Sequence, residues 1–281
     1  MKCHITTFIA VALMTGGLYS CGKGEPAAPF TEFTEVFFDA EKTALRNNGA
    51  GVFIAAKYNG QPIEWNVLSK KIKVVTGEGK FEFYDTRNGA VVAEKVIDVK
   101  AGAGQTFTLF QPTLDAPVSF IDPDAQANET PAPAGQIKLK VANYAQDLIP
   151  FAKLDLRVSI SYYDADWNEV VEEVGMIRDV QDAVDKATYH LLPDGIPDPM
   201  PEIGYTYRFE FLDGETGEPL RNHGGTAYSN LAFSPWGMDP APERNVFTVY
   251  MVAREAWGEA PPFIKKGEAY YEIETTMLFA N

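Results

Sequence analysis

Apolar and polar residues alternate in short runs along much of the chain. In "KFEFYD" (80–85), Phe81 and Phe83 fall on one side of an extended backbone, because successive side chains of a strand point to opposite faces. The run ends at Asn88-Gly89, a strong short-range hairpin signal. Another apolar run, "VVAEKVIDV" at 91–99, follows the turn. This pattern predicts β-strands joined by tight turns.

The same hairpin occurs twice. The segments "FEFYDTRNG" (81–89) and "FEFLDGETG" (209–217) are identical at five of nine positions. Each is followed by a similar strand, "FTLF" at 107–110 and "FTVY" at 247–250. The order of these elements predicts two copies of one β-module.

The boundaries of the two copies follow from a Pro-rich segment. Residues 122–135 contain three prolines and no large apolar residue, and such a stretch is unusual inside one compact domain. We therefore expect a linker at 122–135 between a first domain at 30–121 and a second at 136–281. In this alignment, the strand at 136–144 corresponds to the strand at 51–58.

The second copy is longer in two places. The alignment gives it an insertion at 145–203 and a longer loop at 221–243. Within the insertion, 153–163 alternates as a strand and 168–177 is a candidate partner for a hairpin. The segment 178–187 is predicted to form a short helix.

Short strands, Gly and Asn turns and little helix are typical of β-sandwiches. We expect an all-β chain with two tandem immunoglobulin-like β-sandwich domains, the second with a long insertion. The order of strands resembles immunoglobulin-like and fibronectin-like modules. The strand from Ala103 to Phe110, which follows a small-residue turn, also resembles the tandem β-sandwich lipoproteins of Gram-negative outer membranes. This resemblance implies a fold and carries no chemistry.

The first residues have the features of an export signal. Lys2 precedes an apolar run at 5–14, which is too short to span a bilayer as a helix. "LYSC" then resembles the lipobox of bacterial lipoproteins, which implies a signal peptide at 1–20, lipidation of Cys21 and a tether at 21–29. The implied location is the outer membrane, with the protein lipid-anchored on its periplasmic or cell-surface face. The alternative is a plain secretory signal with a chance cysteine.

Composition narrows the class of partner and of chemistry. Cys3 leaves with the signal and Cys21 would carry the lipid, so the folded part has no thiol for a disulfide, a nucleophile or a metal. The formal charge is −15 and no long basic cluster exists, which argues against a nucleic-acid partner. We expect no cofactor.

Catalytic motifs do not emerge from the sequence. Only His190 and His223 remain after the signal, and no familiar nucleophile or phosphate-binding motif occurs. "DADWNE" (164–169) starts like a calcium loop, but Glu169 and Gly175 occupy positions that require Gly and Glu. It is therefore predicted to be a hairpin turn without a metal, with a calcium site of another type as the alternative.

Aromatic residues beside turns suggest a binding surface, because sugars stack on exposed rings. We expect the two insertions to meet at one end of the second sandwich. The candidate residues are Tyr163, Trp167, His223, Tyr228 and Trp236. The competing interpretation is that 153–163 only adds strands to the sheet and that the segment around Trp236 packs over its edge.

Two function hypotheses remain. The first is a non-catalytic surface lipoprotein that binds a glycan or an envelope protein, and therefore not an enzyme. The alternative is a glycan hydrolase with a carboxylate pair in the second domain, which requires two carboxylates within roughly 5–10 Å of each other in a cleft.

Overall fold

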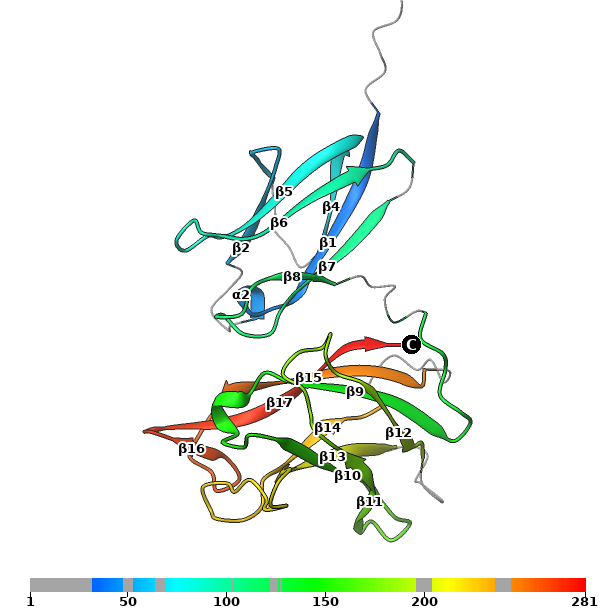
Figure 1. The fold of residues 1–281 in the computed structure, drawn as a ribbon, viewed down its shortest axis with the longest axis vertical. Coiled ribbons are helices and arrows are strands. Elements are labelled where there is room, and N and C mark those ends of the chain that lie inside the picture. Colours follow the sequence, from blue (N-terminus) through cyan, green and yellow to red (C-terminus); the bar gives the residue numbers. More distant parts are fainter. Residues whose placement is uncertain are drawn as a thin grey trace, which may run out of the picture.

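The computed structural model describes residues 32–47, 53–63, 69–102, 104–121, 126, 128–195, 204–235 and 244–281. These residues form β-strands almost throughout, which confirms the predicted all-β sandwich (Figure 1). Four sheets form two stacked pairs, one from the N-terminal part of the described chain and one from the C-terminal part.

The first sandwich consists of two four-stranded sheets, in the orders β4-β1-β7-β8 and β3-β2-β5-β6. A short helix, α2 (Ala44–Asn47), follows β1. The strands are β1 (Phe33–Thr43), β2 (Ile54–Tyr58), β3 (Gln61–Ile63), β4 (Ser69–Val75), β5 (Gly77–Asp85), β6 (Val91–Val99), β7 (Gln105–Gln111) and β8 (Ser119–Ile121).

The second sandwich has sheets in the orders β12-β9-β15-β17-β16 and β11-β10-β13-β14. A short 3-10 helix, η2 (Gln146–Leu148), connects β9 to β10. The strands are β9 (Gln136–Asn143), β10 (Leu154–Tyr163), β11 (Glu169–Ile177), β12 (Tyr189–Pro193), β13 (Tyr205–Asp213), β14 (Ser229–Phe233), β15 (Val246–Glu255), β16 (Ile264–Lys266) and β17 (Ala269–Ala280).

Strand order shows that the two sandwiches share one topology. In each, the first strand pairs in parallel with the strand that follows the hairpin, β1 with β7 and β9 with β15. β9 therefore corresponds to β1, and β10 corresponds to β2. The alignment of 136–144 with 51–58 is wrong by one strand, because both segments alternate and alternation alone does not distinguish them.

The segment 145–203 accordingly contributes strands as well as loops. β10 lies between β11 and β13, and its residues Leu156, Val158 and Ile160 are fully buried. The segment 153–163 is therefore a strand of the sheet, and the predicted insertion at 145–203 is wrong, because β10 has a counterpart in β2 and belongs to the fold that both sandwiches share. The predicted helix at 178–187 is not formed. Instead, Val180 N–H donates to Leu154 O and Gln181 bridges to Ala142, so this segment follows its neighbouring strands.

Each sandwich has its own buried core. In the first, Phe38 of β1 packs against Phe81, Phe83 and Phe107, with ring centroids 4.9, 5.0 and 5.6 Å away. In the second, the repeated phenylalanines Phe209 and Phe211 are both fully buried. The alternation in the sequence thus predicts which face of each hairpin strand is buried.

The repeated sequence also specifies a repeated turn. Asp85 N–H donates to Ala90 O and Gly89 N–H donates to Asp85 O. The second hairpin has equivalent bonds around Asp213 and Gly217. Both glycines have left-handed backbones, with φ of +75° and +76°. The shared Asp and Gly of the two segments therefore serve the turn.

Replacing Gly217 with alanine should lower the free energy of unfolding by about 1 kcal/mol, because a side chain destabilises the left-handed backbone. A Cβ at this position would contact nothing within 4 Å, so the expected cost is purely conformational. Chemical denaturation measures it. Gly258→Ala is the matched control, since its Cβ also meets open space and its φ is not left-handed. Equal stabilities of the two variants would contradict this account of the turn.

The predicted linker packs against the second sandwich where it is described. Gln126 is buried, and its Nε2 donates to Val246 O at 3.0 Å, while Thr248 Oγ1 donates to its Oε1 at 2.5 Å. Further along, Asn245 and Ala132 exchange two hydrogen bonds. The described part of the segment is thus attached to the second sandwich at Gln126 and at Ala132.

An aromatic contact joins the two sandwiches. Phe110, at the end of β7, lies edge-on to Tyr144 and Tyr250, with ring centroids 5.7 and 5.0 Å away. Leu278 and Ala142 complete this small cluster. The sheet that contains β9 and β15 therefore faces the first sandwich, and the sheet that contains β10 and β13 faces away from it (Figure 1).

Candidate functional site

The turn between β10 and β11 is organised by one aspartate. The Asp164 carboxylate accepts hydrogen bonds from the backbone N–H groups of Asp166 and Asn168, each at 2.9 Å. The Trp167 N–H donates to Asp164 O at 3.0 Å. The prediction of a hairpin turn is confirmed, and its geometry explains the aspartate without a metal ion.

Trp167 occupies a position at which glycine is expected. Its φ is +64°, in the left-handed region, where an L-residue is destabilised by roughly 1–2 kcal/mol. In the two repeated hairpins, Gly89 and Gly217 take this backbone conformation. A bulky side chain at such a position is an outlier, and a strained residue that persists is a reason to look for function.

The Trp167 side chain projects into solvent beside Tyr163. Trp167 is 65% exposed and Tyr163 is 41% exposed. Their ring centroids are 6.4 Å apart and the rings are tilted by 48°. The pair offers apolar ring surface to solvent at the tip of the hairpin.

Polar groups stand next to this aromatic pair. Glu169 lies opposite Tyr163 across the β10–β11 pairing. Its Oε1 accepts hydrogen bonds from Ser161 Oγ and Arg208 Nη2, both at 2.8 Å. The carboxylate is therefore oriented while its side chain remains 46% exposed. We name Ser161, Tyr163, Trp167, Glu169 and Arg208 the hairpin site.

Sequence reasoning found the aromatic half of this site and missed the polar half. Tyr163 and Trp167 lie close together, as expected. Glu169 and Arg208 were missed because their contact joins residues 39 positions apart on two strands. No local pattern signals such a pair.

Tyr228 does not belong to an exposed surface, and its predicted binding role is corrected. The side chain is 4% exposed and packs against Phe211, with ring centroids 5.4 Å apart. Its Oη accepts a hydrogen bond from Ile273 N–H at 2.8 Å. Burial raises the pKa of Tyr228 to about 12. This tyrosine is part of the core of the second sandwich.

His223 lies at the opposite end of the sheet from Trp167, so the expected single surface is not formed. β13 pairs antiparallel with β10, with Tyr205 opposite Tyr162 and Asp213 opposite Leu154. The turn with Trp167 follows the Tyr205 end, and the loop with His223 follows the Asp213 end. Figure 1 shows that loop in yellow at the lower left and the β10–β11 turn at the lower right. The β10–β11 turn and the β13–β14 loop thus lie at opposite ends of the sheet.

Two candidate site residues, Cys21 and Trp236, lie outside the described residues. Membrane attachment and any contribution of Trp236 therefore remain predictions.

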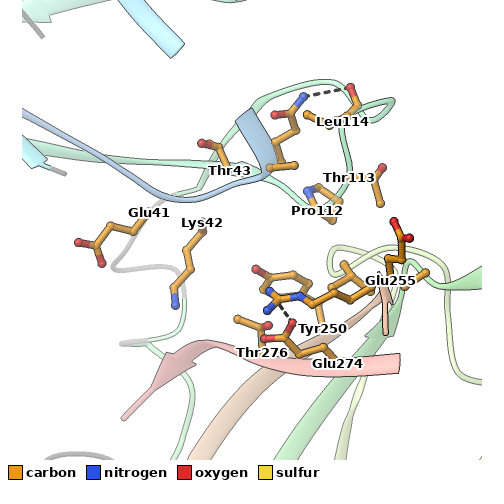
Figure 2. A pocket seen from close by; sticks show the side chains of 15 residues that line it. Glu41, Lys42, Thr43, Pro112, Thr113, Leu114, Tyr250, Glu255, Glu274 and Thr276 are labelled. Atoms are coloured by element: carbon orange, nitrogen blue, oxygen red, sulfur yellow. Dashed lines mark hydrogen bonds and ion pairs between the residues drawn. The ribbon is translucent and has the colours of Figure 1, made fainter. Parts of the chain in front are cut away.

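A cleft of ≈ 850 Å³ separates the two sandwiches beside the Phe110 contact (Figure 2). Glu41 and Lys42 line it from the first sandwich, whereas Glu255 and Glu274 line it from the second. Arg254 Nη2 lies 2.5 Å from Glu274 Oε2, so this carboxylate is engaged in an ion pair. The sequence does not predict the cleft, because two separately folded surfaces form it.

No group of three or more His, Cys, Asp or Glu side chains in the described ranges is arranged to hold a metal ion. No helix in the part of the chain that the structure describes is long and apolar enough to cross a bilayer.

Comparison with known proteins identifies no family, since no family model and no curated protein matches the chain. One solved structure, described as alpha-glucan binding by a streptococcal virulence factor, is similar at 12% sequence identity and a TM-score of 0.21. The similarity covers 77% of this chain and 93% of the streptococcal chain. A TM-score this low carries no argument about this protein's ligand.

Proposed function

We propose that this protein is a non-catalytic binding component of the bacterial cell envelope. A lipid on Cys21 holds it at the outer membrane, and the hairpin site binds a neutral glycan. One observation carries the proposal. Trp167 is kept exposed in a left-handed backbone, at a turn position that the two repeated hairpins fill with glycine.

The chemistry of the hairpin site suits a sugar. Trp and Tyr rings provide an apolar surface with a polar edge, onto which the C–H face of a pyranose can stack. Glu169, oriented by Ser161 and Arg208, supplies a fixed acceptor for a hydroxyl, and the Arg208 guanidinium supplies donors. A few placed polar groups beside an apolar surface are typical of ligand sites.

Charge favours a neutral glycan over an anionic one. The chain carries a formal charge of −15, and Glu169 places a carboxylate in the site itself. Acidic polysaccharides would meet repulsion from both.

The position of the site agrees with a membrane anchor upstream of β1. β1 begins at the end of the first sandwich that is farther from the second (Figure 1). An anchor on that side leaves the second sandwich distal to the membrane, with the sheet of the hairpin site facing away from the first sandwich.

Catalysis has no comparable support. Among the three glutamates that line the interdomain cleft, Glu274 is ion-paired with Arg254. Nothing else in the described part of the chain singles out a pair of carboxylates.

Replacing Cys21 with alanine should abolish labelling by a palmitate analogue and release the protein from membranes, because the thiol is the acceptor of the lipid. Metabolic labelling followed by membrane fractionation measures both effects. Cys3→Ala, which changes only the predicted signal peptide, should label as the wild type does. Continued labelling of the Cys21 variant would refute the anchor.

Replacing Tyr163 with alanine should weaken glycan binding about tenfold, since half of the aromatic pair is lost. The test is electrophoresis of the chain from Gly22 onward through native gels that contain a soluble α-glucan, β-1,3-glucan or β-1,4-glucan. The wild type should be retarded in at least one gel.

Tyr84→Ala is the matched control for this experiment. Tyr84 lies on the outer face of the equivalent sheet in the first sandwich, with the Lys57 ammonium over its ring at 4.9 Å. Its loss should leave retardation unchanged. The proposal fails if no gel retards the wild type, or if the two tyrosine variants migrate alike.

A further inference from the structure

Trp257 is the most exposed large apolar side chain among the described residues, at 87%. Its ring touches the ring of Phe263 edge-on, with centroids 5.9 Å apart and planes at 88°. Almost all of the indole surface therefore faces solvent. A lone exposed Trp on a loop is unfavourable in water and favourable for binding.

A second ring pair lies next to it. His223 and Tyr270 meet edge-to-face, with centroids 5.1 Å apart. Backbone hydrogen bonds connect the two pairs: His223 N–H donates to Phe263 O at 2.7 Å, and Ala256 N–H donates to Tyr270 O at 2.8 Å. These bonds bring four residues together, which we name the loop site: Trp257, Phe263, His223 and Tyr270.

The loops that present the loop site hold each other in place. Gly224 N–H donates to Pro261 O at 3.2 Å, and a Cβ at Gly224 would lie 3.3 Å from the Cβ of Pro261. The β13–β14 loop and the β15–β16 loop thus pack closely. A surface ordered before binding loses less entropy when a ligand arrives.

The loop site and the hairpin site lie at opposite ends of the second sandwich. His223 follows the Asp213 end of β13, whereas Trp167 lies beyond the Tyr205 end. Strand β10 spans ten residues between these ends, so the two sites are separated by roughly 30 Å.

We infer that the loop site is a second binding site for the same class of ligand, a neutral glycan. This inference rests on the proposed function and extends it. Trp257 provides a stacking surface, and His223 together with the Tyr270 hydroxyl provides hydrogen-bonding groups. Two sites on one rigid sandwich let a single chain hold two glycan chains, or two segments of a long one, with a gain in avidity.

The test is the stoichiometry of oligosaccharide binding, measured by isothermal titration calorimetry on the chain from Gly22 onward. The ligands are maltohexaose, laminarihexaose and cellohexaose. The wild type should bind two molecules of one hexasaccharide, Trp257→Ala and Trp167→Gly should each bind one, and the double variant should bind none. Trp257 makes so few contacts that its removal should leave the unfolding transition unchanged.

The outcomes separate this inference from the function on which it rests. A wild type that binds one hexasaccharide, lost with Trp167→Gly and retained by Trp257→Ala, overturns the second site and supports the first. An absence of binding by every variant overturns both. Trp257→Ala could instead leave the stoichiometry of hexasaccharide binding unchanged and convert a dimer of the wild type to a monomer in sedimentation. That result also overturns the second site, because the surface is then a protein interface.

Discussion

Phe38→Ala should remove the thermal unfolding transition of the first sandwich and leave that of the second in place. Phe38 is fully buried and contacts three other rings. Truncation of a buried phenylalanine lowers the free energy of unfolding by about 3–5 kcal/mol. In a domain of this size each kcal/mol shifts Tm by about 4–8 °C.

Scanning calorimetry measures this effect, with Phe33→Ala as the matched control. Phe33 lies in the same strand but is 50% exposed, and its ring contacts the Lys73 ammonium at 5.4 Å. Loss of the Phe33 ring should lower the free energy of unfolding by at most about 1 kcal/mol. If Phe38→Ala lowers the stability of the whole chain in one transition, the two sandwiches do not fold independently, and the proposed domain division is wrong.

Local signals predicted much of the fold. Alternation in "FEF" predicted that Phe81 and Phe83 share one face of their strand, and both are fully buried in the core, because a period of two places alternate side chains on the same face. Asn88-Gly89 predicted the first hairpin turn for a different reason, since few residues tolerate the left-handed backbone that Gly89 adopts.

The rest of the fold could not be predicted, because it depends on pairing between strands that are far apart in the sequence. The similarity of 51–58 to 136–144 misled the alignment, because alternation does not reveal a strand's partners. The parallel pairings of β1 with β7 and of β9 with β15 join residues far apart in the chain. Only they establish that β9 corresponds to β1.

In the candidate site, too, local features could be predicted from the sequence and long-range contacts could not. "DADWNE" predicted an exposed turn, and Trp167 is exposed there. By contrast, Tyr228 was expected on the binding surface because it lies in the longer loop at 221–243, and it is buried. Its burial depends on Phe211 and on Ile273, which lies 45 residues away. No signal near Tyr228 in the sequence indicates these contacts.

Trp167→Gly should stabilise the protein and abolish most of the glycan binding at the hairpin site. Glycine relieves the left-handed backbone at φ +64°, so the free energy of unfolding should rise by about 1 kcal/mol. Loss of the indole removes the central stacking surface, and truncation of such an aromatic anchor typically costs about 2 kcal/mol of binding. That corresponds to roughly 30-fold weaker affinity.

Trp167→Tyr is the control for the chemistry of the ring. It keeps both a stacking surface and the left-handed strain, so its stability should match that of the wild type and its affinity should fall only modestly. Comparison of the two variants separates the free-energy cost of the left-handed backbone from the contribution of the side chain to binding.

The most direct test of the central claim measures stability and affinity on the same preparations of Trp257→Ala and of the double variant Trp257→Ala/Trp167→Gly, so that only the hairpin site is compared. Urea denaturation gives the free energy of unfolding, and titration with the best-bound hexasaccharide gives Kd. The account predicts a double variant that is about 1 kcal/mol more stable and binds roughly 30-fold more weakly. A double variant that binds as tightly as Trp257→Ala would contradict it.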